Sequence, residues 1–211
     1  MHPNEIRLSQ VSSSKDNRWI VDKFYLHKLA LPENTSVLDN PDLVSNELQL
    51  ALQKSKIKVK NAAFAIPVTS AIIRVVTSPL MTDDELQKAI ETDSLWENLV
   101  QLTDNLNDYS IFHQIINRNS KNNTMEILFV ASKLADVNAY SSMIKKAGLN
   151  PVIMDVRCFT LKNAHDNTKF KSITDKGNSA ILELGLEENY MIDVLSIATP
   201  TVEWHFFRVL L

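Results

Sequence analysis

The chain has 211 residues, of which 45% are hydrophobic, 22 are Lys or Arg and 25 are Asp or Glu. This composition supports a packed core under a balanced surface, and the net charge of −3 gives no electrostatic footprint for nucleic acid. No apolar run reaches the roughly 18 residues that span a bilayer, and the single cysteine, Cys158, excludes an internal disulfide. We therefore expect a cytoplasmic globular protein without a membrane span.

The N-terminal part predicts two strands and a helix. Residues 5–11 and 18–31 form a strand pair around the polar turn "SSSKDN". A helix follows in "LDNPDLVSNELQLALQKSK", with Asn40 as its cap and Pro41 at its first position. Its apolar stripe consists of Leu43, Val44, Leu48, Ala51 and Leu52.

The middle of the chain predicts strands that alternate with one short helix. "NAAFAIP" indicates a short buried strand and "AIIRVVTS" a second one that ends at Pro79. Thr82 and Glu85 have the spacing of a capping box, which starts a helix. Residues 108–116 and 125–132 are two further strands, joined by the polar turn "NRNSKNNT".

The last third predicts a helix, a strand, another helix and a terminal group of strands. The first helix runs from about Lys133 to Ala147 and ends at Gly148, which adopts a left-handed cap easily. "PVIMDV" is a strand and "RCFTLKNAH" a helix, and the polar segment 166–178 resembles a domain boundary. The hairpin "SAILELGLEENYMIDVLS" and the strand "TVEWHFFRVLL" complete a mixed α/β order.

Few motifs in this sequence carry chemistry. With three glycines the chain contains no Walker loop and no GxGxxG, and it also lacks HExxH, CxxC and GxSxG. Two groups of polar residues are interpreted as structural, the histidines because they are scattered and the acidic residues because they lie at a helix start or along a solvated face. These residues are His27, His113 and His205, and Asp83, Asp84, Glu85, Asp93, Glu97, Asp104 and Asp108. We therefore expect no catalytic and no metal-binding residue.

The order of several segments resembles the PilM family, the actin-like proteins of type IV pilus machines. The segments are "NAAFAIPVTSAIIRVV", "DDELQKAIETD", "NDYSIFHQII", "MEILFVASKLADVNAYSSMIKKAGLNPVIMDV" and "RCFTLKNA". In the family they are a strand that ends in proline, a second strand, an acidic helix, two strands, a helix that ends in Ala-Gly-Leu, a strand and a helix. The order and spacing hold over roughly residues 5–211.

The resemblance implies an actin-like fold, related to RNase H, with an inserted β/α subdomain of the SHS2 type. It implies that residues 1–69 and 157–170 form the core of the first lobe and that residues 70–156 are the insert. Residues 178–211, which hold the hairpin and the last strand, would begin a truncated second lobe. The family continues beyond Leu211 with an adenine-binding subdomain.

The nucleotide site of the family looks degenerate in this sequence. The first phosphate loop would lie before Met1, and the second hairpin keeps Gly185 but has Glu183 where the family has Asp. Glu187 and Glu188 stand where the family has small hydroxyl residues, and their charges repel phosphate. We expect a protein that is not an enzyme and has no cofactor, with ATP and Mg²⁺ only if the site is more intact than it looks.

The function implied by the resemblance is that of a cytoplasmic adaptor at an inner-membrane assembly platform. Such an adaptor binds the cytoplasmic tail of a PilN-like, single-span membrane protein in a groove between the lobe core and the insert. Candidates for the groove lining are Ala62, Phe64, Ile66 and Pro67. An actin-like ATPase is the enzymatic alternative, and an adaptor of type II secretion or of cell division is the other. The apolar strand at the C-terminus predicts either self-association or a longer polypeptide.

Overall fold

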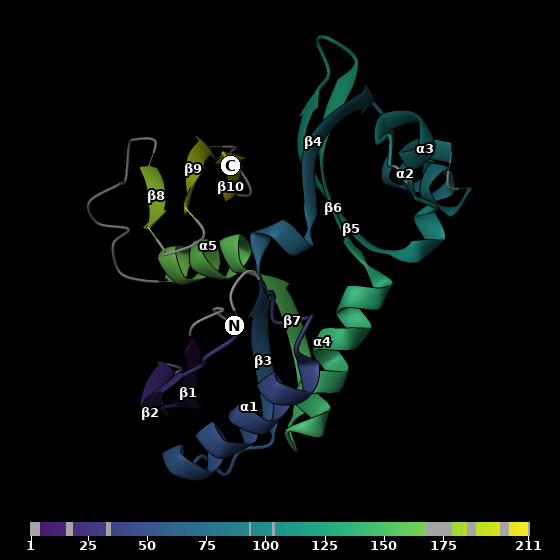
Figure 1. Ribbon diagram of the computed structural model, residues 1–211. Helices are drawn as coiled ribbons and strands as arrows, with labels where there is room; N and C mark the ends of the chain where they lie inside the picture. The colour runs from purple at the N-terminus through teal and green to yellow at the C-terminus, as the bar shows by residue number, and fades with distance from the viewer. Residues whose placement is uncertain are drawn as a thin grey trace. The chain divides into compact units, whose positions relative to one another are not determined.

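The computed structural model divides into two compact units, Met1–Ser70 with Leu134–Val156 and Ala71–Lys133 with Arg157–Leu211 (Figure 1). It describes residues 5–15, 19–32, 35–92, 94–102, 104–167, 179–184, 189–198 and 203–210. Strands and helices are mixed along the chain, as the sequence predicts. Each unit is built around its own sheets, so the two are described separately.

The first unit begins with an antiparallel hairpin of β1 (Glu5–Ser13) and β2 (Trp19–Lys28). The register shifts after Gln10, where a bulge allows Val11 to pair with Val21. One face of the hairpin is covered, with Ile6 1% and His27 7% exposed. Helix α1 (Pro41–Ser55) packs against both strands and provides this cover.

Helix α1 differs from its prediction at two residues. Pro41 occupies the first helical turn as expected, but the side chain of Asn40 makes no capping hydrogen bond. Its amide donates instead to Thr35 Oγ1 at 3.0 Å and to the carbonyl of Ser36 at 3.3 Å, so the expected cap is wrong. Leu43 is 39% exposed and does not belong to the buried stripe. The buried residues of α1 are Val44, Ser45, Leu48 and Ala51.

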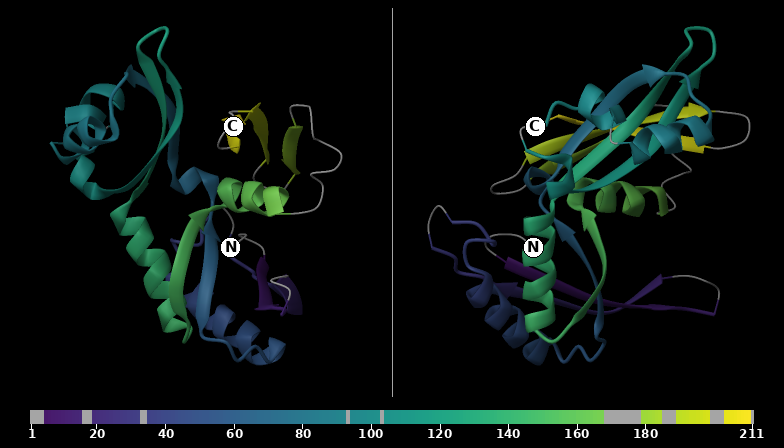
Figure 2. Two further views of the ribbon diagram at one scale, coloured as in Figure 1. Left: turned by 180° about the vertical axis from the view of Figure 1, so that it is seen from behind. Right: turned by 90° about the vertical axis from the view of Figure 1, so that its right-hand side faces the viewer.

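A parallel strand pair forms the other half of the first unit. It consists of β3 (Asn61–Ile66) and β7 (Asn150–Val156), in a register from Asn61 opposite Asn150 to Ile66 opposite Val156. Helix α4 (Leu134–Lys146) precedes β7 and packs against it and against α1 (Figures 1 and 2). Gly148 has a φ of 86°, which is the left-handed cap that the sequence predicts.

The second unit contains a three-stranded antiparallel sheet of β4 (Ile72–Pro79), β6 (Thr124–Lys133) and β5 (Tyr109–Asn119), with β6 in the centre. Helices α2 (Asp83–Glu91) and α3 (Ser94–Leu99) lie on one side of this curved sheet (Figure 2). The short 3-10 helix η2 (Leu106–Asp108) leads into β5. The indole of Trp96, 1% exposed, contacts the ring of Phe129 with centroids 5.0 Å apart.

The second unit also contains α5 (Arg157–Asn167) and the antiparallel sheet of β8 (Ser179–Leu184), β9 (Asn189–Ala198) and β10 (Glu203–Leu210). Strand β9 is central, and β10 pairs with it from Glu203 opposite Ala198 to Leu210 opposite Met191. The prediction that the terminal strand joins the hairpin sheet is confirmed. The predicted boundary at 166–178 lies for the most part outside the described residues.

The division into units differs from the expected insert of residues 70–156. Residues 134–156 belong with the first unit, because β7 pairs with β3 and α4 packs against α1. A parallel strand pair requires a crossover connection, and α4 supplies the return to β7. The segment 71–133 alone therefore has the character of an insert, while residues 157–211 are grouped with it and not with the first unit.

Candidate functional site

The predicted partner-binding residues lie on β3 and just before the 3-10 helix η1 (Val68–Ser70). Because side chains alternate along a strand, Ala62, Phe64 and Ile66 share one face of β3. Ile66 is only 3% exposed and belongs to the core, whereas Ala62, Phe64 and Pro67 are half-buried. Three of the four predicted residues thus keep accessible surface.

The backbone of β3 offers a second means of recognition. Strand β7 occupies one edge of β3, and no strand among the described residues pairs with the other edge. An extended peptide can bind at the edge of a sheet as an added strand. The combination of this edge with half-buried apolar side chains suits a peptide ligand better than a small molecule.

The end of β3 is fixed to helix α4 within the first unit. The hydroxyls of Ser70 and Tyr140 are 3.4 Å apart, and the Tyr140 side chain is 3% exposed. Val68, at 4% exposed, holds η1 in the core. These contacts stabilise the position of the end of β3.

An exposed apolar row on β2 was not predicted as a surface feature. The register places Trp19, Val21, Phe24 and Leu26 on the outer face of the hairpin, where they are 76%, 62%, 65% and 45% exposed. Trp19 is not part of the core. Contiguous exposed apolar side chains of this kind mark interaction surfaces. The sequence signal was the run "WIVDKFYL", which is apolar on both faces.

The hairpin that the resemblance compares with a phosphate loop contains an ion pair. The guanidinium of Arg157, at the start of α5, contacts the carboxylate of Glu183 on β8, and the two side chains are 19% and 22% exposed. The Glu183 carboxylate is therefore neutralised by a mostly buried cation, and a metal ion would have to compete with Arg157 for it. Gly185, Glu187 and Glu188 lie outside the described residues.

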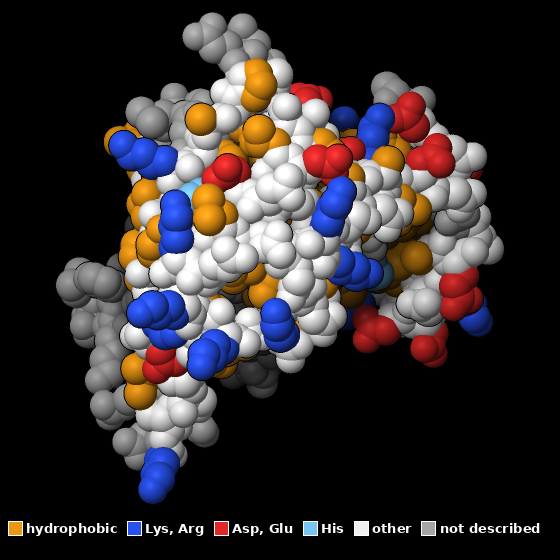
Figure 3. All heavy atoms as spheres, turned by 60° about the horizontal axis from the view of Figure 1, so that its bottom comes forward, with side chains coloured by type: hydrophobic (Ala, Val, Ile, Leu, Met, Phe, Trp, Pro, Cys, Tyr) orange, Lys and Arg blue, Asp and Glu red, His pale blue; other side chains and the backbone are white. Residues whose placement is uncertain are grey.

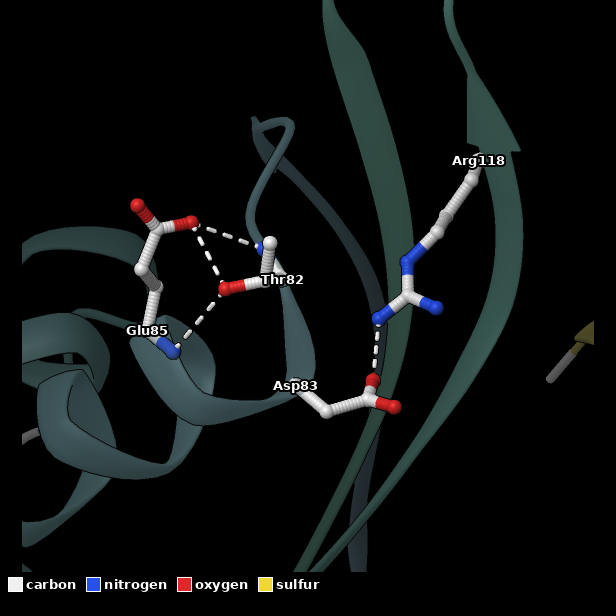
Figure 4. A network of polar contacts seen from close by, with 4 residues as sticks. All are labelled: Thr82, Asp83, Glu85 and Arg118. Atoms are coloured by element: carbon white, nitrogen blue, oxygen red, sulfur yellow. Dashed lines mark hydrogen bonds and ion pairs between the residues drawn. The ribbon is translucent and has the colours of Figure 1, made fainter.

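The acidic cluster at the start of α2 has structural partners (Figure 4). Glu85 accepts a hydrogen bond from the backbone N–H of Thr82 at 2.8 Å, and its own N–H donates to Thr82 Oγ1 at 3.3 Å. The predicted capping box is thus confirmed, and the bonds from Thr82 hold the pKa of Glu85 below its ordinary value. Asp83 forms an ion pair with Arg118 on β5.

Two of the three histidines interpreted as structural have partners in the structure. His27 Nε2 lies 2.6 Å from a Glu47 carboxylate oxygen. The ring of His113 contacts the tilted indole of Trp96, and the two ring centroids are 5.6 Å apart. Burial lowers the pKa of His113. The side chain of His205 lies outside the described residues. Within the described part of the chain, no group of three His, Cys, Asp or Glu side chains has the arrangement of a metal site.

Comparison with models of protein families shows which family this chain belongs to. The family model described as "Type IV pilus assembly protein PilM" matches residues 2–196. The chain belongs to the PilM family. This result supports a pilus protein over the alternatives of a secretion or cell-division protein. No curated protein sequence matches the chain significantly.

Solved structures show the fold of this PilM-family chain. A chain of the structure described as "PilM-PilN type IV pilus biogenesis complex" matches with a TM-score of 0.73 at 16% identity, over 99% of this chain and 59% of that one. The cytoplasmic domain of EpsL, an inner-membrane component of the type II secretion system of Vibrio cholerae, matches with a TM-score of 0.50 at 8% identity, over 97% and 67%. The actin-like fold expected from the sequence is confirmed, and the chain spans less than two thirds of the first of these structures.

Proposed function

We propose that this PilM-family chain is a non-enzymatic adaptor that binds the cytoplasmic tail of a PilN-like, single-span membrane protein. The observation that carries the proposal is the match of 99% of the chain, at a TM-score of 0.73, to a chain from a PilM–PilN complex. No helix in the described residues is long and apolar enough to cross a membrane. In this proposal the partner brings the protein to the inner membrane.

The tail is proposed to bind along β3 in an extended conformation. The tail is proposed to run along the edge of β3 opposite β7, where Ala62, Phe64 and Pro67 supply apolar contacts. Phe64 is the largest of these side chains and is half-buried, so a partner can complete its burial. Aromatic residues in such positions usually contribute most to a peptide interface.

Titration of a labelled tail peptide against the purified chain tests the adaptor role. We expect saturable binding that Phe64→Ala weakens about tenfold. Phe112→Ala is the matched control, because Phe112 is 59% exposed and lies on β5, outside the proposed site. Absence of saturable binding to the tail of any cognate platform protein would contradict the proposal, and an equal effect of the two variants would contradict the location.

The absence of ATPase activity is part of the same proposal. The carboxylate of Glu183 is engaged by Arg157, and Glu187 and Glu188 carry negative charge where phosphate would bind. Removal of one preorganised electrostatic donor typically costs about a hundredfold to a thousandfold in rate. Calorimetry with Mg-ATP tests this point: micromolar binding, or phosphate release that Glu183→Ala abolishes, would restore the ATPase alternative.

The segment 71–133 is proposed to be the SHS2-like subdomain of the family. Its three-stranded sheet covered by α2 and α3 agrees with a β/α subdomain of that kind. Self-association remains a separate proposal. Light scattering of the purified chain at increasing concentration tests it, and a constant monomer mass would contradict it.

A further inference from the structure

Seven lysines lie along one end of the first unit, on the path from the C-terminus of α1 through residues 56–60 to the start of β3 and the C-terminus of α4. Lys54 is in the last turn of α1, and Lys56, Lys58 and Lys60 alternate through the segment that leads to β3. Lys145 and Lys146 close α4, and Lys23 reaches this region from β2. We call this set of seven residues the basic end.

Backbone contacts hold the basic end together. Lys60 Nζ donates to the carbonyl of Gly148 at 3.2 Å, and the Asn150 N–H donates to the carbonyl of Lys60 at 2.8 Å. The segment after α1 is thereby fixed beside the C-terminus of α4. Lys23 Nζ donates to the carbonyl of Lys56, which ties the hairpin to the same place. The lysines are thus presented on an ordered surface.

Most of these charges have no compensating carboxylate. Among the residues that the structure describes, only Lys146 of the seven forms an ion pair, with Asp42 at 2.6 Å. Lys23 and Lys60 donate to carbonyl oxygens and so keep their net charge. Lys and Arg side chains gather over the left and centre of the face in Figure 3, which brings the bottom of Figure 1 forward. A cluster of this kind produces a positive surface potential.

Helix stability accounts for only some of these lysines. Lys54, Lys145 and Lys146 lie in the last turns of α1 and α4, where cations interact favourably with the helix dipole. Lys56 is the C-cap residue of α1, and Lys58 and Lys60 lie beyond it, so the helix dipole does not explain the last two. They alternate with Ile57 and Val59, and Val59 is 47% exposed.

We propose that the basic end contacts the anionic phospholipid headgroups of a membrane surface. Clusters of four to eight basic residues bind such surfaces, and each lysine near the surface contributes to the attraction. The exposed side chain of Val59 can enter the headgroup boundary between Lys58 and Lys60. Residues 54–60 and 145–150, which supply six of the seven lysines, contain no arginine and no aromatic residue. This disfavours a nucleic acid, since proteins that bind nucleic acids typically use arginine or stacking side chains. This contact goes beyond tail binding, because it needs no protein partner.

Co-sedimentation of the full chain with vesicles tests the lipid contact. The two probes are vesicles of phosphatidylcholine alone and vesicles with about 30 mol % phosphatidylglycerol, which carries the negative charge. We expect binding to the anionic vesicles only. It should decrease strongly when NaCl is raised from about 50 to about 500 mM, since salt screens the attraction.

Two matched triple variants locate the contact. Lys54→Gln with Lys58→Gln and Lys145→Gln removes three charges of the basic end, and we expect a roughly hundredfold lower partition coefficient. The control, Lys15→Gln with Lys88→Gln and Lys121→Gln, changes the net charge equally at exposed positions elsewhere and should change partition by less than about threefold. Circular dichroism and thermal unfolding verify that both variants fold.

Three outcomes would overturn the proposal. They are equal binding to neutral and anionic vesicles, equal losses in the two triple variants, and binding of duplex DNA without binding of vesicles. Titration of the tail peptide against the basic-end variant separates the two proposals. Wild-type peptide affinity with reduced vesicle binding supports a distinct lipid contact, whereas parallel loss of both would contradict it.

Discussion

Arg157 and Glu183 form an ion pair that joins the first residue of α5 to strand β8, 26 residues further along the chain. The two side chains are 19% and 22% exposed, so each charge is largely removed from water. A charge in such a place depends on its partner, because solvent no longer compensates it fully. The pair therefore links the start of α5 to the packing of the sheet that contains β8.

Replacement of Glu183 by Gln should lower the free energy of unfolding by about 1–3 kcal/mol, because it leaves the Arg157 guanidinium without its counter-charge. The single variant Arg157→Met removes the other charge, and the double variant Arg157→Met with Glu183→Gln should recover part of the loss. Urea denaturation of the wild type, both single variants and the double variant gives the coupling energy. Strictly additive losses would show that the two side chains do not interact.

Trp96 and Trp19 should respond to truncation in opposite ways. Trp96 is 1% exposed and packs against Phe129, so Trp96→Ala should destabilise the second unit by about 3–5 kcal/mol. Trp19 is 76% exposed, so Trp19→Ala should change stability by less than about 0.5 kcal/mol. Thermal unfolding followed by circular dichroism compares the two, and equal shifts in Tm would contradict the placement of these side chains.

His113 should make the stability of the second unit depend on pH. Burial holds its pKa below the ordinary value of 6.5, so the unfolded chain takes up the proton first as the pH falls. The contribution of the neutral ring is complete above about pH 6.5 and is lost as the pH falls through the lower pKa of the folded state. Denaturation between about pH 5 and 8 should show a shallower slope for His113→Gln than for the wild type. An unchanged slope would assign the pH dependence to other groups.

The cost in stability of replacing Gly148 should depend only on how well the new residue adopts the left-handed backbone conformation. Its φ is 86°, and an added Cβ would meet only Lys60 Nζ at 3.8 Å, an ordinary contact with a flexible side chain. Gly148→Ala should therefore cost about 1 kcal/mol from the left-handed backbone, and Gly148→Asn should cost less. Denaturation curves of both variants test the order, and a smaller loss for Ala than for Asn would contradict this explanation.

Local signals in the sequence predicted some helix ends correctly and one incorrectly. The capping box of Thr82 and Glu85 and the glycine cap at Gly148 depend on residues close in the chain, and both are confirmed. Asn40 has the right residue type and position, but Thr35 and Ser36 compete for its side chain. A cap is predictable when no nearby acceptor offers an alternative.

Features that depend on distant residues were outside the reach of sequence patterns. The assignment of residues 134–156 to the first unit rests on the pairing of β3 with β7. Along the chain, these two strands are separated by the whole sheet of β4, β5 and β6. The partner of Glu183 is Arg157, and nothing in the local sequence marks that pairing. Ile66 was a candidate for the groove lining together with Ala62 and Phe64, but it is buried, and its burial depends on the rest of the core.

The antiparallel pairing of β4 and β6 places Ile72 opposite Ala131, near the two ends of the segment 71–133. Adjacent antiparallel strands are about 5 Å apart, so this segment leaves and rejoins the chain at nearly the same point. A short linker can bridge such a gap, and loop closure varies slowly with length. We therefore expect that a short linker can replace this segment while β3, α4 and β7 keep their connections.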